Sequence, residues 1–226
     1  ALFNPALGMT TVVPEINPSK PATVDPGKIV QAIQQCGVTN SFGSPTLWAK
    51  IGVYCDAHDI ELPSLKRILM AGAPVPPPLM QRYRRVLPRG HVHSPYGATE
   101  VLPVSSVMDV EVLESAAERS AEGGGTCVGT LLAGVEARIL PVKEGVLEAA
   151  DLEQALPKGA IGEIVVTGPS VTKAYDRLPE ATRLSKLFEG ERVWHRMGDL
   201  GYLDTEDRLW FCGRKGERVE TAKGVF

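Results

Sequence analysis

The stretch MGDLGYLDTEDRLWFCGRKGER, residues 197–218, decides the fold of this chain. Apolar residues recur on both sides of a short polar turn made of Thr205, Glu206 and Asp207. Two apolar runs joined by such a turn predict a β-hairpin over residues 201–211. The end of the chain is therefore expected to belong to a β-sheet.

The pattern before this hairpin changes near residue 126. From there on it predicts strands and turns, including strands over 135–140 and over GEIVVTG at 162–168. The earlier part alternates instead between helices and strands, expected as helices from 26 and 45, strands over 38–42 and 65–71, and a helix over 76–86. We therefore predict an α/β fold with three parts: an α/β subdomain over 1–125, a β-rich subdomain over 126–212 and a final segment over 213–226.

Composition excludes several classes of protein. The 226 residues are 43% hydrophobic and 23% charged, which is the ordinary balance of a globular protein. The formal charge of −3 gives no field for holding nucleic acid, and no apolar run is long enough to span a bilayer. The four cysteines form no CxxC pair, so reduced thiols in a cytoplasmic protein are expected.

The octapeptide HSPYGATE, residues 93–100, concentrates chemically useful groups on an expected loop. Tyr96 offers a ring that can stack on a purine, and Gly97 lets the main chain come close. Thr99 offers a hydroxyl for a phosphate oxygen, and Glu100 offers the anionic oxygen that magnesium prefers. Core packing is the alternative for the tyrosine. A second loop is expected over the small, polar residues 115–126.

Other candidate groups admit plainer interpretations. Residues 72–74, Gly72, Ala73 and Pro74, form a turn between a strand and a helix. His91 and His93 share one face of a strand, but no third ligand lies at a recognisable spacing, which disfavours a metal site. Asp199 stands at the head of the hairpin, where a carboxylate can accept two hydrogen bonds from a ribose diol.

Three segments in a fixed order identify a family. YGATE at 96–100, GEIVVTG at 162–168, and the GD and GR pairs of 197–218 resemble the adenylate-forming superfamily of acyl-CoA synthetases, peptide adenylation domains and luciferases. The resemblance extends from about residue 28 to residue 224. It implies the later part of the large N-terminal domain of such an enzyme, with ATP and Mg²⁺ as cofactors.

The resemblance also implies roles for individual residues. Those expected to bind the nucleotide are Gly72, Ala73 and Pro74 beside adenine, Tyr96 and Gly97 against it, Thr99 at the α-phosphate, Asp199 on the ribose, and Arg214 on ribose and phosphate. Glu100 is the expected magnesium ligand. Thr99, Glu100 and Arg214 are expected to act in catalysis.

Residues 215–217 lie where relatives have the hinge of a small C-terminal domain. The usual hinge pair is replaced by Gly216 and Glu217. By the same resemblance, the phosphate-binding loop is expected before residue 1 and the catalytic lysine after residue 226. The chain is therefore expected to be one part of a longer enzyme, without the small domain.

A closer resemblance links the opening residues 1–26, the loop around Tyr96 and the WFCGRKGERVET segment to bacterial olefin β-lactone synthetases. It implies a long-chain 2-alkyl-3-hydroxy fatty acid as substrate, whose own hydroxyl closes a lactone without coenzyme A. Association with other enzymes of hydrocarbon biosynthesis is implied too. The alkyl chains are expected near the apolar residues Phe42, Gly43, Pro45, Leu47, Trp48 and Val101, for which core packing is the alternative.

Two other functions remain open at this point. A fatty acyl or aryl CoA ligase of the same superfamily shares the first reaction step and differs only in the acceptor. A non-catalytic nucleotide-binding protein with this fold is the second alternative.

Overall fold

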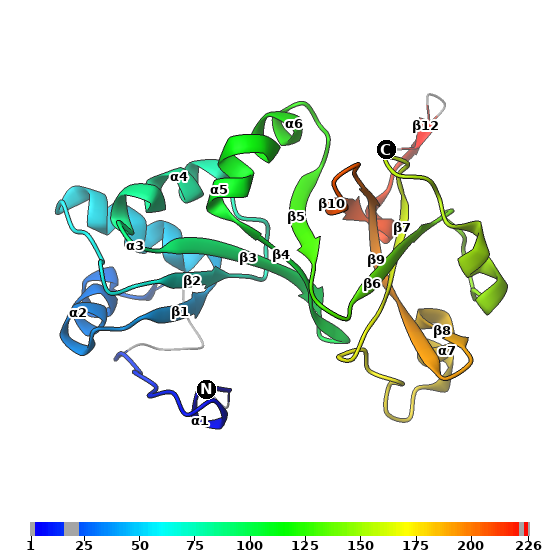
Figure 1. The fold of residues 1–226 in the computed structure, drawn as a ribbon, viewed down its shortest axis with the longest axis horizontal. Coiled ribbons are helices and arrows are strands. Elements are labelled where there is room, and N and C mark those ends of the chain that lie inside the picture. The colour runs from blue at the N-terminus through cyan, green and yellow to red at the C-terminus, as the bar shows by residue number, and fades with distance from the viewer. Residues whose placement is uncertain (1–2, 16–22, 222–223, 226) are drawn as a thin grey trace. The chain divides into compact units, whose positions relative to one another are not determined.

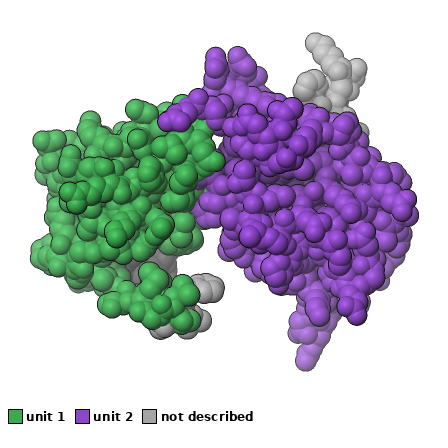
Figure 2. Space-filling model, in the orientation of Figure 1, with its two compact units in different colours: residues 1–94, 108–113 green, residues 95–107, 114–226 purple. Residues whose placement is uncertain are grey.

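The structure, a computed structural model, describes residues 3–15, 23–221 and 224–225. The chain divides into two compact units, which Figure 2 distinguishes by colour. Unit 1 comprises residues 1–94 and 108–113, and unit 2 comprises residues 95–107 and 114–226. Each unit contains strands and helices, labelled in Figure 1, and the α/β fold class is confirmed.

Unit 1 is built on a parallel sheet. Strand β1 (Asn40–Gly43) pairs with β2 (Arg67–Met70), and β2 pairs in the same direction with the start of β3 (His91–Ala98). The helices are α2 (Pro26–Cys36), α3 (Pro45–Ala57) and α4 (Pro77–Val86), as the sequence predicted within one or two residues. Parallel strands need crossover connections, and α3 and α4 supply them, whereas α2 precedes β1.

Local sequence explains where these helices begin and end. The Asp25 carboxylate accepts a hydrogen bond from the Gly27 amide at 2.9 Å, and Ser44 caps α3 in the same way through the Leu47 amide at 3.3 Å. Helix α2 ends at Gly37, whose φ of 58° lies in the left-handed region that glycine adopts without strain.

Two of the residues expected to line an alkyl-chain site are core residues instead. Trp48 is 1% exposed, and its carbonyl oxygen accepts a hydrogen bond from the buried Tyr83 hydroxyl at 2.7 Å. Val101 is fully buried in the core of unit 2. Phe42, in contrast, is 69% exposed. Both side chains therefore pack in the core, and Trp48 Nε1 has no hydrogen-bond partner among the described residues.

Unit 2 is built on antiparallel strands in the order β4-β5-β10-β9-β7-β6. Strand β8 pairs with the first residues of β9, whereas β10 pairs with its last residues. Their core contains Val104, Ile139, Ile164, Val166 and Leu209. The strands are β4 (Val101–Met108), β5 (Thr126–Leu131), β6 (Glu136–Leu140), β7 (Gly162–Thr167), β8 (Lys186–Glu189), β9 (Arg192–Leu203) and β10 (Arg208–Arg214).

The predicted hairpin is confirmed as β9 and β10. The other described elements are short: α1 (Phe3–Ala6), α5 (Asp109–Glu111), a π turn (Val112–Ala116), α6 (Ala117–Ala121), 3-10 turns at Ala149–Gln154 and Lys215–Glu217, α7 (Pro179–Ser185), β11 (Glu220–Thr221) and β12 (Gly224–Val225).

Two expected loops are wrong in part. Residues 115–121 are helical, because Val112 and Ala116 bury an apolar face and the glycine run begins only at Gly123. Residues 93–98 continue strand β3, and only Thr99 and Glu100 form a turn. The extended connection expected over 14–26 falls partly outside the described residues.

The two compact units divide at residue 94, whereas the subdomain boundary was expected at 125/126. Ser105 and Ser106 of β4 pair with β5, so this earlier segment belongs to unit 2. Among the described residues, no helix is both long and apolar enough to cross a membrane.

The turn of the β9–β10 hairpin depends on Asp204. Its buried carboxylate accepts hydrogen bonds from Trp210 Nε1 and Arg208 Nε, each at 2.8 Å, and from the backbone amides of Glu206 and Arg208. Burial acts to raise the pKa of this carboxyl, but these hydrogen bonds outweigh burial and hold the pKa below its usual value.

We expect Asp204→Ala to reduce the free energy of unfolding by about 3 kcal/mol, because several buried donors lose their acceptor. Asp204→Asn, which keeps one acceptor oxygen, should lose less. The contribution of Asp204 is present above the pKa of the unfolded state, about 4, and is lost as the pH falls through the folded pKa. Urea unfolding, followed by tryptophan fluorescence at several pH values, measures the free energy of unfolding of each variant.

The control is Glu206→Gln, which changes an exposed carboxylate of the same turn. If Asp204→Ala and the wild-type chain had equal free energies of unfolding, the role of Asp204 would be contradicted.

Candidate functional site

Three of the residues singled out by the sequence meet in unit 2. The Tyr96 hydroxyl donates to Asp199 Oδ2 at 2.5 Å, across 103 residues of sequence. Asp199 Oδ1 lies 2.9 Å from Arg214 Nη1 as an ion pair, which strand pairing sets up because Arg214 and Asp199 are partners in the β10–β9 ladder. One buried carboxylate thus joins β3, β9 and β10.

Asp199 is a buried carboxylate with a protein partner on each oxygen. The residue is 3% exposed, and burial raises the pKa of its carboxyl against the lowering effect of Tyr96 and Arg214. The Tyr96 phenol is partly buried, which raises its pKa, so it is a hydrogen-bond donor at neutral pH. Oδ2 accepts from Tyr96 and Oδ1 faces the Arg214 guanidinium, and each carboxylate oxygen has a second lone pair.

Gly97 and Gly198, which lie beside Tyr96 and Asp199 in the sequence, have different structural reasons to be glycine. Gly97 lies against β4, and a Cβ there would stand 2.7 Å from the Val101 carbonyl oxygen. Its lack of a side chain therefore serves strand packing. Gly198 precedes Asp199 with a φ of 67° and open space around it, so it allows the turn of the chain that directs Asp199.

Thr99 and Glu100 form the turn between β3 and β4. The Thr99 side chain is exposed. Glu100 Oε1 accepts a hydrogen bond from the Tyr175 hydroxyl at 2.7 Å, which together with the nearby His195 and Lys186 holds the pKa of this carboxyl below its usual value. One hydrogen bond leaves most lone pairs of an ionised carboxylate free, so Glu100 is chemically suited to coordinate magnesium.

Sequence reasoning missed the residues that surround Glu100. Lys186 is buried in β8 and donates to the Thr172 hydroxyl at 3.1 Å, while burial lowers the pKa of its ammonium. His195 pairs with Lys186 across the β8–β9 ladder. Nothing in the sequence pattern distinguishes a buried lysine at a strand end from a solvated one, so this cluster depends on the tertiary structure.

The remaining predicted residues belong to unit 1. Gly72, Ala73 and Pro74 follow β2, where they form the turn before α4. His91 Nδ1 lies 2.9 Å from the buried Asp109 carboxylate. Among the residues that the structure describes, no group of three or more potential metal-binding residues occurs.

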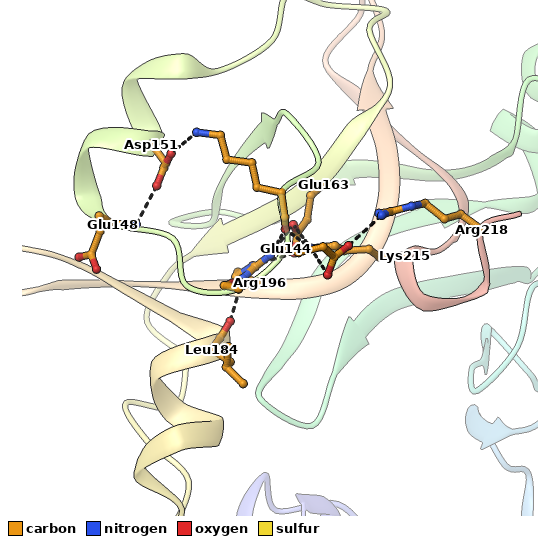
Figure 3. Close-up of polar contacts among 10 residues, drawn as sticks. Glu144, Glu148, Asp151, Glu163, Leu184, Arg196, Lys215 and Arg218 are labelled. Atoms are coloured by element: carbon orange, nitrogen blue, oxygen red, sulfur yellow. Dashed lines mark hydrogen bonds and ion pairs between the residues drawn. The ribbon is translucent and has the colours of Figure 1, made fainter. Parts of the chain in front are cut away.

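Figure 3 shows a second cluster of polar side chains in unit 2, centred on Glu163, the glutamate of GEIVVTG. Glu163 accepts two hydrogen bonds from Arg196, from Nε and Nη2, each at 2.8 Å. Lys215 Nζ donates to Glu163 Oε2 at 3.0 Å and to the Lys143 carbonyl oxygen. These groups line a pocket of about 630 Å³ together with Glu144, Gly198, Gly216 and Arg218.

Comparison with known proteins gives the following relationships. Residues 2–176 match the family described as AMP-binding enzyme. The chain is 44% identical over 230 residues to the olefin β-lactone synthetase of Stenotrophomonas maltophilia, covering 99% of this chain and 41% of that protein. It is 35% identical over 193 residues to the feruloyl-CoA synthase of an Amycolatopsis species, covering 82% of this chain and 34% of that protein.

Among solved structures, the fold resembles O-succinylbenzoate coenzyme A synthetase from Bacillus subtilis in complex with AMP. The TM-score is 0.69 at 25% identity, over 89% of this chain and 36% of that one. The chain thus spans about two fifths of the length of the curated synthetase it matches at 44% identity.

His195 gives a pH prediction. Burial, and then the Lys186 charge, lower the pKa of its imidazole from 6.5 to about 4. As the pH falls, the imidazole is therefore protonated in the unfolded chain before it is protonated in the folded chain. The free energy of unfolding should fall by up to about 3 kcal/mol as the pH drops from 6.5 toward 4. NMR titration of the imidazole should show a neutral ring at pH 5.5, and His195→Gln should flatten the stability profile in this range. A ring that titrates near pH 6.5 would contradict this.

Proposed function

Since this chain belongs to the AMP-binding enzyme family, we propose that the protein containing it joins a carboxylic acid to AMP and releases pyrophosphate. In this step the substrate carboxylate attacks the α-phosphorus of ATP, and the bond to the β-phosphate oxygen breaks. The observation that carries the proposal is the buried Asp199, whose carboxylate is held by Tyr96 on one oxygen and by Arg214 on the other.

Asp199 is proposed to bind the ribose, whose diol can donate two hydrogen bonds to one carboxylate. Arg214 is proposed to reach ribose and phosphate oxygens, since its side chain is 59% exposed beyond the ion pair. The Tyr96 ring, with Gly97, is proposed to pack against the adenine. Thr99 is proposed as a hydroxyl donor to the α-phosphate.

Glu100 is proposed to hold Mg²⁺, which suits its ionised carboxylate and the fixed orientation that the Tyr175 hydroxyl gives it. The metal ion, when bound, offsets negative charge on the phosphate oxygens. The Tyr175 hydroxyl orients the Glu100 carboxylate. The buried Lys186 lies near the Tyr175 ring, and its positive charge helps to lower the pKa of Glu100.

The proposed acid is a long-chain 2-alkyl-3-hydroxy fatty acid, supported by the 44% identity to an olefin β-lactone synthetase. In the second step the 3-hydroxyl oxygen of the acyl adenylate attacks the acyl carbon, AMP leaves, and the hydroxyl proton is lost. Holding both groups on one molecule gives a high effective concentration, which favours closure of the four-membered ring. The free cysteines are consistent with a cytoplasmic location.

A CoA ligase is the second candidate, supported by the 35% identity to a feruloyl-CoA synthase. The first step would be the same, and the thiol of coenzyme A would replace the internal hydroxyl.

The product of the full-length protein distinguishes these functions. We expect a β-lactone and AMP from ATP, magnesium and a racemic 2-alkyl-3-hydroxy fatty acid without coenzyme A, identified by NMR and mass spectrometry. A thioester formed only with coenzyme A would support the ligase instead. Absence of pyrophosphate release with either acceptor would support a non-catalytic nucleotide-binding protein.

Substitutions test the two carboxylates separately. Asp199→Ala should raise the KM for ATP about tenfold or more, because hydrogen bonds to a charged group are lost. Glu100→Gln should chiefly lower the rate of pyrophosphate release and raise the magnesium concentration needed for half-maximal rate. The matched control is Asp207→Asn in the hairpin turn, which should change neither. Wild-type kinetics in either variant would refute that role.

A further inference from the structure

Lys215 is held differently from its neighbour Arg214. The side chain of Lys215 is 12% exposed, whereas that of Arg214 is 59% exposed. Arg214 contacts Asp199, and Lys215 contacts Glu163 and the Lys143 carbonyl oxygen. The last residue of β10 and the first residue of the turn that follows thus contact two different carboxylates of unit 2.

The Glu163–Arg196 pair does not need Lys215. The five N–H groups of Arg196 make five hydrogen bonds, two to Glu163 and three to the carbonyl oxygens of Lys143, Gly145 and Leu184 (Figure 3). One guanidinium already balances the single charge of Glu163. The ammonium of Lys215 is therefore a second cation on this buried carboxylate, with the exposed Glu144 carboxylate 4.0 Å away, and its desolvation costs free energy.

The β9–β10 ladder ends at Arg214. Its backbone pairs with Asp199, after a register shift between Phe211 and Gly213, and its largely exposed side chain makes an ion pair with the same buried residue. The anchored Lys215 holds the chain at the next position, where this pairing has ended. At the following residue, Gly216, a Cβ would meet no atom within 4 Å.

We infer that Lys215 is a positioning residue: its contacts with Glu163 and the Lys143 carbonyl fix the end of β10, so that Arg214 is directed at Asp199 and at a bound nucleotide. This inference rests on the proposed nucleotide site and adds to it the residue that holds the arginine in place.

AMP binding to the full-length protein, measured by calorimetry, tests the inference in a double-mutant cycle. We expect Lys215→Met, which keeps the length and packing of the stem, to weaken AMP binding about tenfold, and Arg214→Ala to do the same. The double variant should be no weaker than Arg214→Ala alone, because Lys215 acts through the arginine. Lys215→Arg, which restores the charge, should recover most of the affinity.

The matched control is Lys158→Met, whose ammonium pairs with the exposed Asp207 at 2.7 Å in the same unit. It should leave AMP binding unchanged. Unchanged binding in Lys215→Met, or losses that multiply to about a hundredfold in the double variant, would overturn the inference while leaving the proposed function intact. Failure of the wild-type protein to bind AMP would overturn the proposed function, and this inference with it.

Discussion

Strand β9, Arg192–Leu203, is the constraint on which unit 2 depends. It pairs with β7, β8 and β10, and three functional or structural side chains lie on it: His195, Arg196 and Asp199. Because a twelve-residue strand is fixed by three neighbours, the residues along it have fixed positions relative to one another. The buried contacts of β9 therefore position both polar clusters of the unit.

The Arg196 and Asp199 clusters on β9 differ in their exposure. Arg196 and Glu163 bond each other and nearby carbonyl groups, and both side chains are buried, so they stabilise the sheet. Asp199 is held by Tyr96 on one oxygen and by Arg214 on the other. Because the Arg214 side chain is 59% exposed, this cluster reaches solvent through the guanidinium.

Much of the fold could be predicted from sequence because local rules apply to it. Asp25 and Gly37 cap α2 as their residue types predict, and the apolar runs around the 205–207 turn pair as β9 and β10. The loop predicted over 115–126 was wrong for residues 115–121, which are helical. There, polar and small residues follow the apolar face that Val112 and Ala116 bury, and burial outweighed composition.

The sequence by itself determined the family, since YGATE, GEIVVTG and the GD and GR pairs occur in a fixed order, and it identified Tyr96, Asp199 and Arg214 as candidates. Only the tertiary structure decided that these three meet at one buried carboxylate, because strand pairing joins residues more than a hundred positions apart. It alone placed Lys186 beside Glu100 and Lys215 on Glu163. Burial of a lysine depends on which strands cover it, and no local pattern encodes that.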